Sequence, residues 1–463
     1  AVTSGTINLG AGTDKITLGN FANTVTLSNI ETITGGTDDD VVTLGALLSG
    51  GVVNLGSGDD TLTLGNFANV LTISNVETLV GGTGADTVTL GTAVTSGTIN
   101  LGAGTAILTL GSFANTVTVT NIETVTGGNS NDIVMLGAAL TGTVNLGGGT
   151  DTLTLGDFAN SVTISGVETL VGGTSSDVVT LAAAVTSGTL DLDDGTDTIT
   201  LGNFSNTVTL SNIETINGGT GADTVTLGTA VTSGTLSLGA GTDKLTLGDF
   251  ANTVTLSNIE TITGGASADV VTLGTAMSGG VVNLGSGADV LTLGAFTNTV
   301  TVSNVETLTG GASADLVTLG TAITTGTVDL AGGADSLTLG AFTNTLTVSN
   351  IETVTGGGSN DIVTVGAALT GIVNLGGGTD TLVLGDFANS VTVSNVETLT
   401  GGTSADVIVI GASQATGVIN LGDGTDTLTF GAFNTTVTVS NVETITGGSS
   451  AEVLTLGTAV TTG

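Results

Sequence analysis

The sequence of 463 residues lacks His, Cys, Pro, Trp, Tyr and Arg altogether, and its only cations are Lys15 and Lys244. Without Cys there is neither a disulfide framework nor a thiolate metal site. Without His, the usual ligand of transition metals and the commonest general base are both absent. Any bound metal ion must therefore accept oxygen ligands.

The charge is almost entirely of one sign, because 40 Asp and Glu residues against two Lys give a formal net charge of −38. A surface this acidic repels nucleic acid and anionic membranes, so neither is expected as a partner. No apolar run approaches the ~18 residues of a membrane-spanning segment, and the first ten residues lack the regions of a signal peptide. We expect no membrane insertion, and any targeting signal lies outside these residues.

One segment recurs along the whole chain. It begins at Asn8 and returns at residues 54, 100, 145, 191, 237, 283, 329, 374 and 420, which gives ten repeats of 46 residues with two single-residue deletions. Each repeat holds two related halves, such as LGSGDDTLTLG (55–65) and GGTGADTVTLG (81–91). Both halves follow the pattern Gly-x-Gly-x-Asp and then alternate polar and apolar residues.

The segments between the Gly-rich turns, among them DTLTLG, NTVTLSN and GTINL, are short, rich in Thr and β-branched residues, and alternate with a period of two. This pattern indicates strands. Short strands at a fixed period, joined by Gly, Asn and Asp turns, are typical of a parallel β-solenoid in which each coil pairs with the next. The prediction is an all-β chain that forms one continuous solenoid over residues 1–463.

Two coil sizes fit the repeat, about 23 residues or all 46. One Glu recurs per repeat, and stacking it in every coil at ~4.8 Å would place like charges side by side. About two coils per repeat, or about twenty in all, are therefore favoured. The halves are unequal, because the interval from Asp14 to Asp40 is longer than that from Asp40 to Asp60, and this predicts an extra bend near Ser28 and Asn29. The recurrent Glu residues are Glu31, Glu77, Glu123, Glu168, Glu214, Glu260, Glu306, Glu352, Glu397 and Glu443.

The GGTGAD sequences at 81–86 and 218–223, each followed by TVTL, resemble the Gly-Gly-x-Gly-x-Asp-x-apolar-x nonapeptide of RTX, or haemolysin-type, calcium-binding repeats. The similarity extends over all ten repeats, and the phrase SNVETLxGG is similar to the arrays of large bacterial surface proteins. The resemblance implies a right-handed parallel β-roll whose turns bind Ca²⁺ between neighbouring coils. It also implies a secreted protein or one displayed on a bacterial surface.

The chain departs from that nonapeptide in a regular way. In the second half of the repeat, the fourth-position Gly survives only as Gly84 and Gly221 and is mostly Ser elsewhere. In the first half that Gly is always present, whereas the leading Gly is replaced, usually by Leu. The sixth-position Asp is the most persistent residue and is lost only at Ala106 and Glu452. These departures predict an altered turn geometry.

Calcium takes about 6 to 8 oxygen ligands, which carbonyl-rich Gly turns and one Asp from each of two neighbouring coils can supply. A column of unneutralised Asp carboxylates opposes folding, so cation binding and folding are expected to be coupled. The alternative is that each Asp only shapes its turn by bonding its own backbone. The predicted Ca²⁺ ligands are Asp14, Asp40, Asp60, Asp86, Asp132, Asp151, Asp177, Asp197, Asp223, Asp243, Asp269, Asp289, Asp315, Asp335, Asp361, Asp380, Asp406 and Asp426.

Two further recurrent residue types have structural interpretations. The Glu residues are expected to accept backbone N–H groups at a bend, because catalysis on a sugar needs two carboxylates in unlike environments rather than ten equivalent copies. An Asn two residues after a Phe, as in Asn23, Asn69 and Asn160, predicts a side-chain ladder. The Phe residues are expected to stack as an internal ladder. They are Phe21, Phe67, Phe113, Phe158, Phe204, Phe250, Phe296, Phe342, Phe387 and Phe433.

Outward Thr residues such as Thr17 and Thr43 raise the alternative of ice binding. The neighbouring outward column argues against an ice plane, because it contains Val41, Ile133, Val178, Val270, Leu316, Ile362, Val407 and Val453. That column indicates lateral contact with a protein or with another copy of this chain, or else a strand packed under a long loop of its own coil.

The preferred interpretation is a non-enzymatic extracellular structural protein of the bacterial cell surface, a calcium-stabilised solenoid that self-associates into a filament, stalk or surface layer. The alternatives are an adhesin spacer or ice-binding rod and, least favoured, a polysaccharide-active enzyme. The segments at 1–5 and 459–463 share the phase of the repeat. They predict a window of a longer array or a unit that stacks end to end.

Overall fold

The computed structural model describes residues 1–458, which form strands joined by turns. No helix in this range is long and apolar enough to cross a membrane. The chain divides into two compact units, Ala1–Thr229 and Ala230–Gly463, and each is considered by itself. A single continuous array over residues 1–463 stays a prediction. The segment 459–463, whose match to the repeat was noted above, lies outside the described residues.

The strands of the N-terminal unit are β1 (Gly5–Asn8), β2 (Lys15–Thr17), β3 (Thr24–Ser28), β4 (Thr32–Gly36), β5 (Val41–Leu44), β6 (Ser49–Gly56), β7 (Thr61–Thr63), β8 (Val70–Ser74), β9 (Thr78–Gly82), β10 (Thr87–Leu90), β11 (Gly97–Gly102), β12 (Ile107–Thr109), β13 (Thr116–Thr120), β14 (Thr124–Gly128), β15 (Ile133–Leu136), β16 (Thr141–Gly147), β17 (Thr152–Thr154), β18 (Ser161–Ser165), β19 (Thr169–Gly173), β20 (Val178–Leu181), β21 (Gly188–Asp193), β22 (Thr198–Thr200), β23 (Thr207–Ser211), β24 (Thr215–Gly219) and β25 (Thr224–Leu227). Those of the C-terminal unit are β26 (Gly234–Gly239), β27 (Lys244–Thr246), β28 (Thr253–Ser257), β29 (Thr261–Gly265), β30 (Val270–Leu273), β31 (Ser278–Gly285), β32 (Val290–Thr292), β33 (Thr299–Ser303), β34 (Thr307–Gly311), β35 (Leu316–Leu319), β36 (Thr327–Ala331), β37 (Ser336–Thr338), β38 (Thr345–Ser349), β39 (Thr353–Thr355), β40 (Ile362–Val365), β41 (Thr370–Asn374), β42 (Thr381–Val383), β43 (Ser390–Ser394), β44 (Thr398–Gly402), β45 (Val407–Ile410), β46 (Val418–Gly422), β47 (Thr427–Phe430), β48 (Thr435–Ser440), β49 (Thr444–Thr446) and β50 (Glu452–Leu456).

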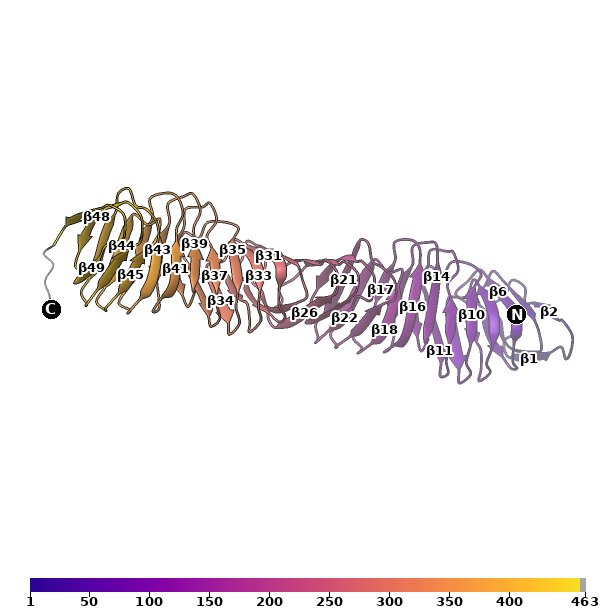
Figure 1. Ribbon diagram of the computed structural model, residues 1–463. Coiled ribbons are helices and arrows are strands. Elements are labelled where there is room, and N and C mark those ends of the chain that lie inside the picture. Colours follow the sequence, from indigo (N-terminus) through magenta and orange to yellow (C-terminus); the bar gives the residue numbers. More distant parts are fainter. Residues whose placement is uncertain (459–463) are drawn as a thin grey trace. The chain divides into compact units, whose positions relative to one another are not determined.

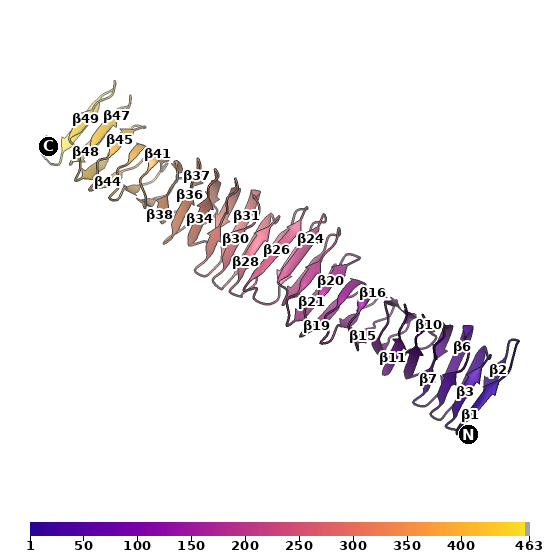
Figure 2. The same cartoon turned by 90° about the horizontal axis from the view of Figure 1, so that it is seen from below.

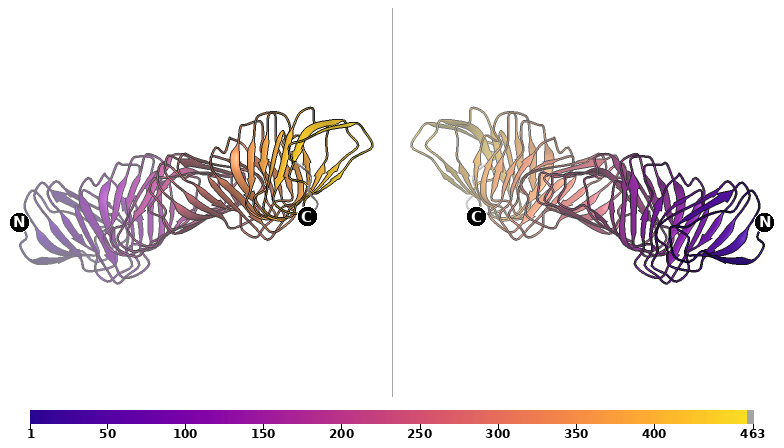
Figure 3. Two further views of the ribbon diagram at one scale, coloured as in Figure 1. Left: turned by 90° about the vertical axis from the view of Figure 1, so that its left-hand side faces the viewer. Right: turned by 90° about the vertical axis from the view of Figure 1, so that its right-hand side faces the viewer.

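Within each unit, a strand pairs in parallel with the strand two places further along the chain. Thr24 in β3 aligns with Val41 in β5, and Val41 aligns with Thr61 in β7. The odd-numbered strands therefore form one sheet and the even-numbered strands form another, as successive rungs (Figures 1 and 2). Seen nearer to end-on, the coils are flattened loops with a strand on either side (Figure 3). The predicted all-β parallel solenoid is confirmed.

One coil contains two strands and is smaller than either predicted size. Turn residues that are hydrogen-bonded between neighbouring coils lie 17 residues apart at Asn23 and Asp40, and 20 residues apart at Asp40 and Asp60. A repeat contains five strands, because Asn8 lies in β1 and its equivalent Asn54 lies in β6. The repeat is thus two and a half coils, and the prediction of about two is wrong.

The half-integral number of coils is caused by residues 28–31 and their equivalents, which we call the SNxE turn. The sequence predicts only an extra bend at this short turn. Asn29 has the left-handed φ of 55°, and the chain reverses there completely between β3 and β4. The predicted bend near Ser28 and Asn29 is therefore confirmed in place, but it closes half a coil. As a result, equivalent strands of consecutive repeats, such as β5 and β10, belong to opposite sheets.

This half-integral repeat separates residues that were expected to stack. Equivalent Glu or Phe residues on one side of a unit are five coils apart, or ~24 Å. The Glu carboxylates therefore do not repel one another as they would if one stood in every coil. The Phe residues lie at the turns, and none of the ten belongs to the buried core. Phe21 is 57% exposed, and the ring of Phe67 lies over its own turn at Gly65. The predicted internal Phe ladder is wrong.

The core is aliphatic and arranged in columns. Inward-facing Val42, Leu62 and Leu79 occupy successive coils at one register and are no more than 1% exposed. Because successive strand residues point to opposite faces, the intervening Thr side chains face outward. The alternation of apolar and polar residues in the sequence therefore separates the side chains of the core from those of the surface.

The half-integral repeat can be tested by cross-linking, since the chain contains no native Cys. In the double variant Thr26→Cys/Thr43→Cys the two sulfurs lie on paired positions of neighbouring coils, so we expect an intramolecular disulfide under mild oxidation. The control is Thr43→Cys/Thr89→Cys. Its residues occupy equivalent positions one repeat apart, in β5 and β10 of opposite sheets, and should remain reduced at low protein concentration. Cross-linking of the control, with none in the first variant, would show a single coil of 46 residues per repeat.

Candidate metal sites at the turns

The predicted Asp ligands lie directly before strands that follow two kinds of turn. We call residues 81–86 and their equivalents the GG turns, which precede strands such as β10. Residues 55–60 and their equivalents are the LG turns, which precede strands such as β7. Of the 18 predicted Asp residues, all but Asp14 are buried, with at most 2% of their surface exposed.

The Asp side chains belong to a ladder of hydrogen bonds that runs from coil to coil. Asp40 Oδ1 accepts the backbone N–H of Asn23 at 2.9 Å, and Asp60 Oδ1 accepts that of Asp40 at 2.7 Å. Glu77 Oε2 then accepts the N–H of Asp60 at 2.9 Å. The fifth position is aliphatic, as at Val94, and the order repeats. Each side chain satisfies an N–H that begins a strand in the preceding coil.

The ladder assigns roles to Asn and Glu. Buried Asn69 donates its side-chain N–H to Asp86 Oδ1 at 2.9 Å, and its own Oδ1 accepts the N–H of Leu48. Asn thus joins the Asp residues instead of stacking on other Asn residues, which corrects that expectation. The predicted role of Glu, accepting backbone N–H groups at a bend, is confirmed.

The Asp residues occur as pairs rather than as a continuous column. The Asp of a GG turn and the Asp of the LG turn in the next repeat lie in adjacent coils, flanked by Asn on one side and Glu on the other. In the two units the hydrogen-bonded pairs are Asp40/Asp60, Asp132/Asp151, Asp177/Asp197, Asp269/Asp289, Asp315/Asp335, Asp361/Asp380 and Asp406/Asp426. This arrangement brings together one Asp from each of two neighbouring coils, as predicted for calcium.

The second carboxylate oxygen of these residues has no protein partner. Burying an anionic oxygen without a hydrogen bond or a counter-charge is strongly unfavourable, so this atom is suited to bind a cation. The residues whose Oδ2 is buried without a hydrogen bond are Asp14, Asp40, Asp60, Asp86, Asp132, Asp151, Asp177, Asp197, Asp269, Asp289, Asp315, Asp335, Asp361, Asp380, Asp406 and Asp426.

Backbone carbonyl groups lie beside these oxygens. A Cβ atom on Gly35 would lie 2.7 Å from Asp40 Oδ2 and would overlap the Leu55 carbonyl oxygen of the next coil. In an LG turn, a Cβ on Gly195 would lie 2.9 Å from Asp197 Oδ2 and 3.1 Å from the Ser175 carbonyl oxygen. Glycine therefore leaves space at the places where carbonyl and carboxylate oxygens converge.

This donor set fits a hard cation. Among residues 1–458 there is no group of three or more Asp or Glu side chains that could hold a metal ion by itself. Two Asp carboxylates must therefore be completed by carbonyl oxygens, which Ca²⁺ accepts readily at about 2.3–2.6 Å in flexible geometries. The bound ion would neutralise the buried Oδ2 atoms, while Oδ1 keeps its bond to the backbone.

The electrostatics agree with this assignment. Burial raises the pKa of the LG-turn residue Asp60 to about 6, because the ionised carboxylate loses its hydration; the nearby charges of Glu77 and Asp40 raise it further, against the N–H of Asp40. Burial raises the pKa to about 6 also at Asp151, Asp197, Asp289, Asp380 and Asp426. At GG-turn residues such as Asp86, burial raises the pKa and bonds from Asn69 oppose the rise.

The substitution of Ser for the fourth Gly of a GG turn has a structural reason. Gly84 packs so closely on the Phe67 carbonyl that a Cβ in that conformation would overlap it. Where the residue is Ser175, its Oγ donates to the Asp157 carbonyl oxygen of the preceding coil at 3.2 Å. The Ser turns thus form an inter-coil bond in place of close packing, and the Asp that follows keeps its position in the ladder.

Three positions depart from the pairing. Ala106 replaces an LG-turn Asp opposite Asp86, although Glu123 still accepts the Ala106 N–H at 2.7 Å. Glu452 bonds Gly448 within its own turn, four residues away, instead of a neighbouring coil. Asp14 bonds Glu31 through its N–H and is only half-buried.

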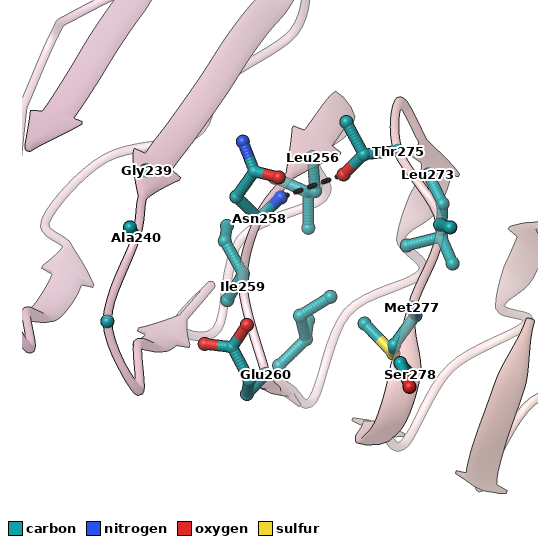
Figure 4. Close-up of a pocket in the computed structure, with 13 residues that line it drawn as sticks. Gly239, Ala240, Leu256, Asn258, Ile259, Glu260, Leu273, Thr275, Met277 and Ser278 are labelled. Carbon is teal, nitrogen blue, oxygen red and sulfur yellow. Dashed lines mark hydrogen bonds between the residues drawn. The ribbon is translucent and has the colours of Figure 1, made fainter. Parts of the chain in front are cut away.

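The short SNxE turn leaves a recess of about 270 Å³ in the C-terminal unit (Figure 4). It lies between the longer turns that carry Ala240 and Met277, and the carboxylate of Glu260 is on its wall. Glu260 Oε2 accepts the N–H of Asp243 at 2.8 Å. Asn258 closes another side through its N–H bond to Thr275 Oγ1 at 2.9 Å. The Glu contact recurs in every repeat, and the Asn–Thr contact recurs at Asn75, Asn212, Asn304 and Asn441, so the recess follows from turn length and has no distinct chemistry.

Comparison with known families gives a local match. Residues 74–92 and 210–229 match the RTX calcium-binding nonapeptide repeat (4 copies). These segments contain Gly84 and Gly221, the two GG turns that keep the fourth Gly. The chain therefore carries RTX-type calcium-binding repeats, and Ca²⁺ is the cation that its paired turns fit.

Comparisons with whole proteins add little. No curated protein matches the chain. A solved structure that matches is a hyperactive, Ca²⁺-dependent, β-helical antifreeze protein from an Antarctic bacterium, at 16% identity over 85% of each chain with a TM-score of 0.13. A superposition this poor carries no argument.

Sequence reasoning located the Asp residues but missed their organisation. The signal is present as spacing: 17 residues from Asn23 to Asp40, 20 to Asp60 and 17 to Glu77, which are the lengths of single coils. Once the coil length is known, the four residues fall into one ladder.

The raised pKa values predict how the metal-free protein responds to pH. The folded-state pKa of about 6 at residues such as Asp60 lies above the unfolded value of 3.8. The folded state therefore binds more protons between these values, and stability falls as pH rises through 6. With EDTA present, the melting temperature should be higher at about pH 5 than at about pH 7.5. In saturating Ca²⁺ the trend should reverse, because the ion binds the ionised form. A metal-free protein that is less stable at the lower pH would contradict the assigned burial.

Proposed function

We propose that this chain, which carries RTX-type calcium-binding repeats, is a non-enzymatic structural protein of the bacterial exterior, a calcium-stabilised β-solenoid that self-associates into a filament, stalk or surface layer. One observation carries the proposal: buried Asp oxygens without protein partners recur in stacked pairs of Gly turns. Such sites stabilise the folded chain only when a cation fills them.

An extracellular setting suits this chemistry. The chain has no Cys or His that would select a soft or borderline metal, and its 40 acidic residues need divalent counter-ions. Calcium sites of extracellular modules have dissociation constants of roughly 10⁻⁴–10⁻³ M, which calcium concentrations inside cells do not reach. Folding that waits for calcium would be completed outside the cell.

The repetition of the site favours structure over catalysis. Glycoside hydrolysis needs two carboxylates in unlike environments around an accessible bond. Asp60 and Glu77 are neighbours in the ladder, but Asp60 is fully buried and its Oδ1 already accepts a backbone N–H. The same contacts recur at Asp151 and Glu168. A row of equivalent, buried carboxylates therefore favours a structural role over a catalytic one.

The outward columns favour the structural proposal over an ice-binding rod. Val41 stands between Thr24 and Thr61 in one column, and Val80 follows Thr63 in the next. Paired Thr columns of the kind that an ice plane requires are thus interrupted within every few coils. An adhesin spacer differs from the preferred proposal only in lacking self-association.

Calcium counting with single substitutions tests the proposal. Asp151→Asn removes one carboxylate from the Asp132/Asp151 pair, so we expect one fewer bound Ca²⁺ per chain by native mass spectrometry. Ala106→Asp supplies the carboxylate missing opposite Asp86 and should add one ion. The matched control is Asp157→Asn, which removes an exposed acidic residue of a neighbouring turn and should leave the count unchanged.

Chelation gives the second readout. EDTA should lower the β-sheet circular dichroism and the melting temperature of the wild type, and Ca²⁺ in the millimolar range should restore both. If all four proteins bind the same number of ions and melt alike with or without EDTA, the Asp residues only shape turns and the proposal fails.

A further inference from the structure

Charge is segregated from the broad surfaces of each unit. Only four of the 40 acidic residues fall within strands; all the others lie in the turns. The four are Asp191, Asp193, Asp329 and Glu452. We call the outward surface of the odd-numbered strands of a unit its odd face, and that of the even-numbered strands its even face. Both faces are nearly free of charge, although the chain as a whole carries −38.

The same two faces hold most of the exposed apolar side chains. Ile133 and Met135 on the odd face of the N-terminal unit are 50% and 48% exposed, and Val70 and Val178 on its even face are 47% and 48% exposed. Only four of the large exposed apolar residues lie outside strands, namely Leu9, Phe21, Leu47 and Phe433. The alternative that a loop of the same coil covers the outer Val and Ile residues is wrong, because these residues are open to solvent.

The two faces of a unit are chemically equivalent because a repeat is two and a half coils. The first outward position of the strand that follows a GG turn is Val41 in β5, on the odd face, and Val178 in β20, on the even face. The C-terminal unit repeats this with Val270 in β30 on its even face and Leu316 in β35 on its odd face. Whatever one face binds, the opposite face binds as well.

We propose that the occupant of these faces is a second copy of this chain, packed face to face, so that each unit has two association surfaces on opposite sides. The proposal names the contact by which the structural protein proposed above would self-associate, and it rests on that function. A molecule of such high negative charge can approach its own copy only where charge is absent, and the faces are the surfaces that meet this condition.

The available area is sufficient. A unit has 12 or 13 strands on each face. At ~4.8 Å between strands and ~15 Å of strand length, one face offers on the order of 900 Å². A stable interface buries ~800 Å² per partner. Face-to-face contact covers Val and Thr side chains and leaves the carboxylates of the turns in water, so it avoids burying unpaired charge. A basic partner would instead be expected at the acidic turns.

Two sets of substitutions test the proposal on the full chain with calcium bound. The odd-face variant combines Val41→Glu, Ile133→Glu, Leu316→Glu and Val407→Glu. The even-face variant combines Val70→Glu, Val178→Glu, Val270→Glu and Ile362→Glu. The control places the same four charges on exposed apolar residues outside the faces, as Leu9→Glu, Phe21→Glu, Leu47→Glu and Phe433→Glu.

Sedimentation velocity over a concentration series gives the readout. The wild type and the control should form species larger than dimers as concentration rises. Either single-face variant should form smaller species than the wild type, because each unit keeps only one face, and the combination of both variants should sediment as the monomer of 44.4 kDa. This two-step loss of assembly distinguishes two equivalent association faces from a single association face.

Four outcomes would overturn the proposal. They are a wild type that remains monomeric with calcium bound, face variants that assemble like the wild type, a control that loses assembly as the face variants do, and a monomer whose faces bind ice or an insoluble polysaccharide instead. Ion counts and circular dichroism on the same samples keep the calcium-stabilised fold apart from the face contact, since the wild type can bind calcium and fold without assembling. A wild type that binds no calcium contradicts the proposed function and not the face contact.

Discussion

The structure depends on a hydrogen bond between an acceptor side chain at the start of one strand and a backbone N–H at the start of the strand one coil earlier. A solenoid coil turns sharply at these points, and an N–H left there without a partner would be unsatisfied in a buried position. A side chain with an oxygen acceptor satisfies it, which explains the Asn, Asp and Glu at these positions. An Asp that fills this role carries a second oxygen into the interior, and that oxygen creates the need for a cation. Folding and metal binding thus follow from one geometric requirement.

The order of residues in the ladder limits the electrostatic penalty. Asp60 has one Asp neighbour, Asp40, whose other neighbour is the neutral Asn23. On its other side, Glu77 is followed by an aliphatic position at Val94. Carboxylates are therefore grouped in threes and separated by amide and hydrocarbon, whereas a uniform column would place a charge in every coil. The neutral positions divide the charge into units that one divalent ion can serve.

Much of the fold can be predicted from the sequence, and the error in the predicted coil length has a physical cause. Strand type, parallel pairing, the bend near Ser28 and Asn29 and the Asp residues of the turns all follow from alternation and turn chemistry. The coil length does not, because the two most similar segments of a repeat, at 55–65 and 81–91, suggested by their similarity that they mark successive coils. In the fold they lie on opposite sheets, with the dissimilar strands β8 and β9 between them. The Phe residues were misplaced for the same reason, since a column was inferred where recurrence alternates between two sides.

A repeat that ends half a coil out of phase with its start has a consequence for how such a gene can change length. Unequal crossing-over that gains or loses one whole repeat block rotates everything downstream by half a turn. In a solenoid with two dissimilar sides, that rotation would exchange the sides, and only even numbers of blocks would be tolerated. Here the two sides of a unit carry the same kinds of residue. Single blocks can therefore be inserted or deleted without disturbing either surface or the pairing of the turn Asp residues in neighbouring coils.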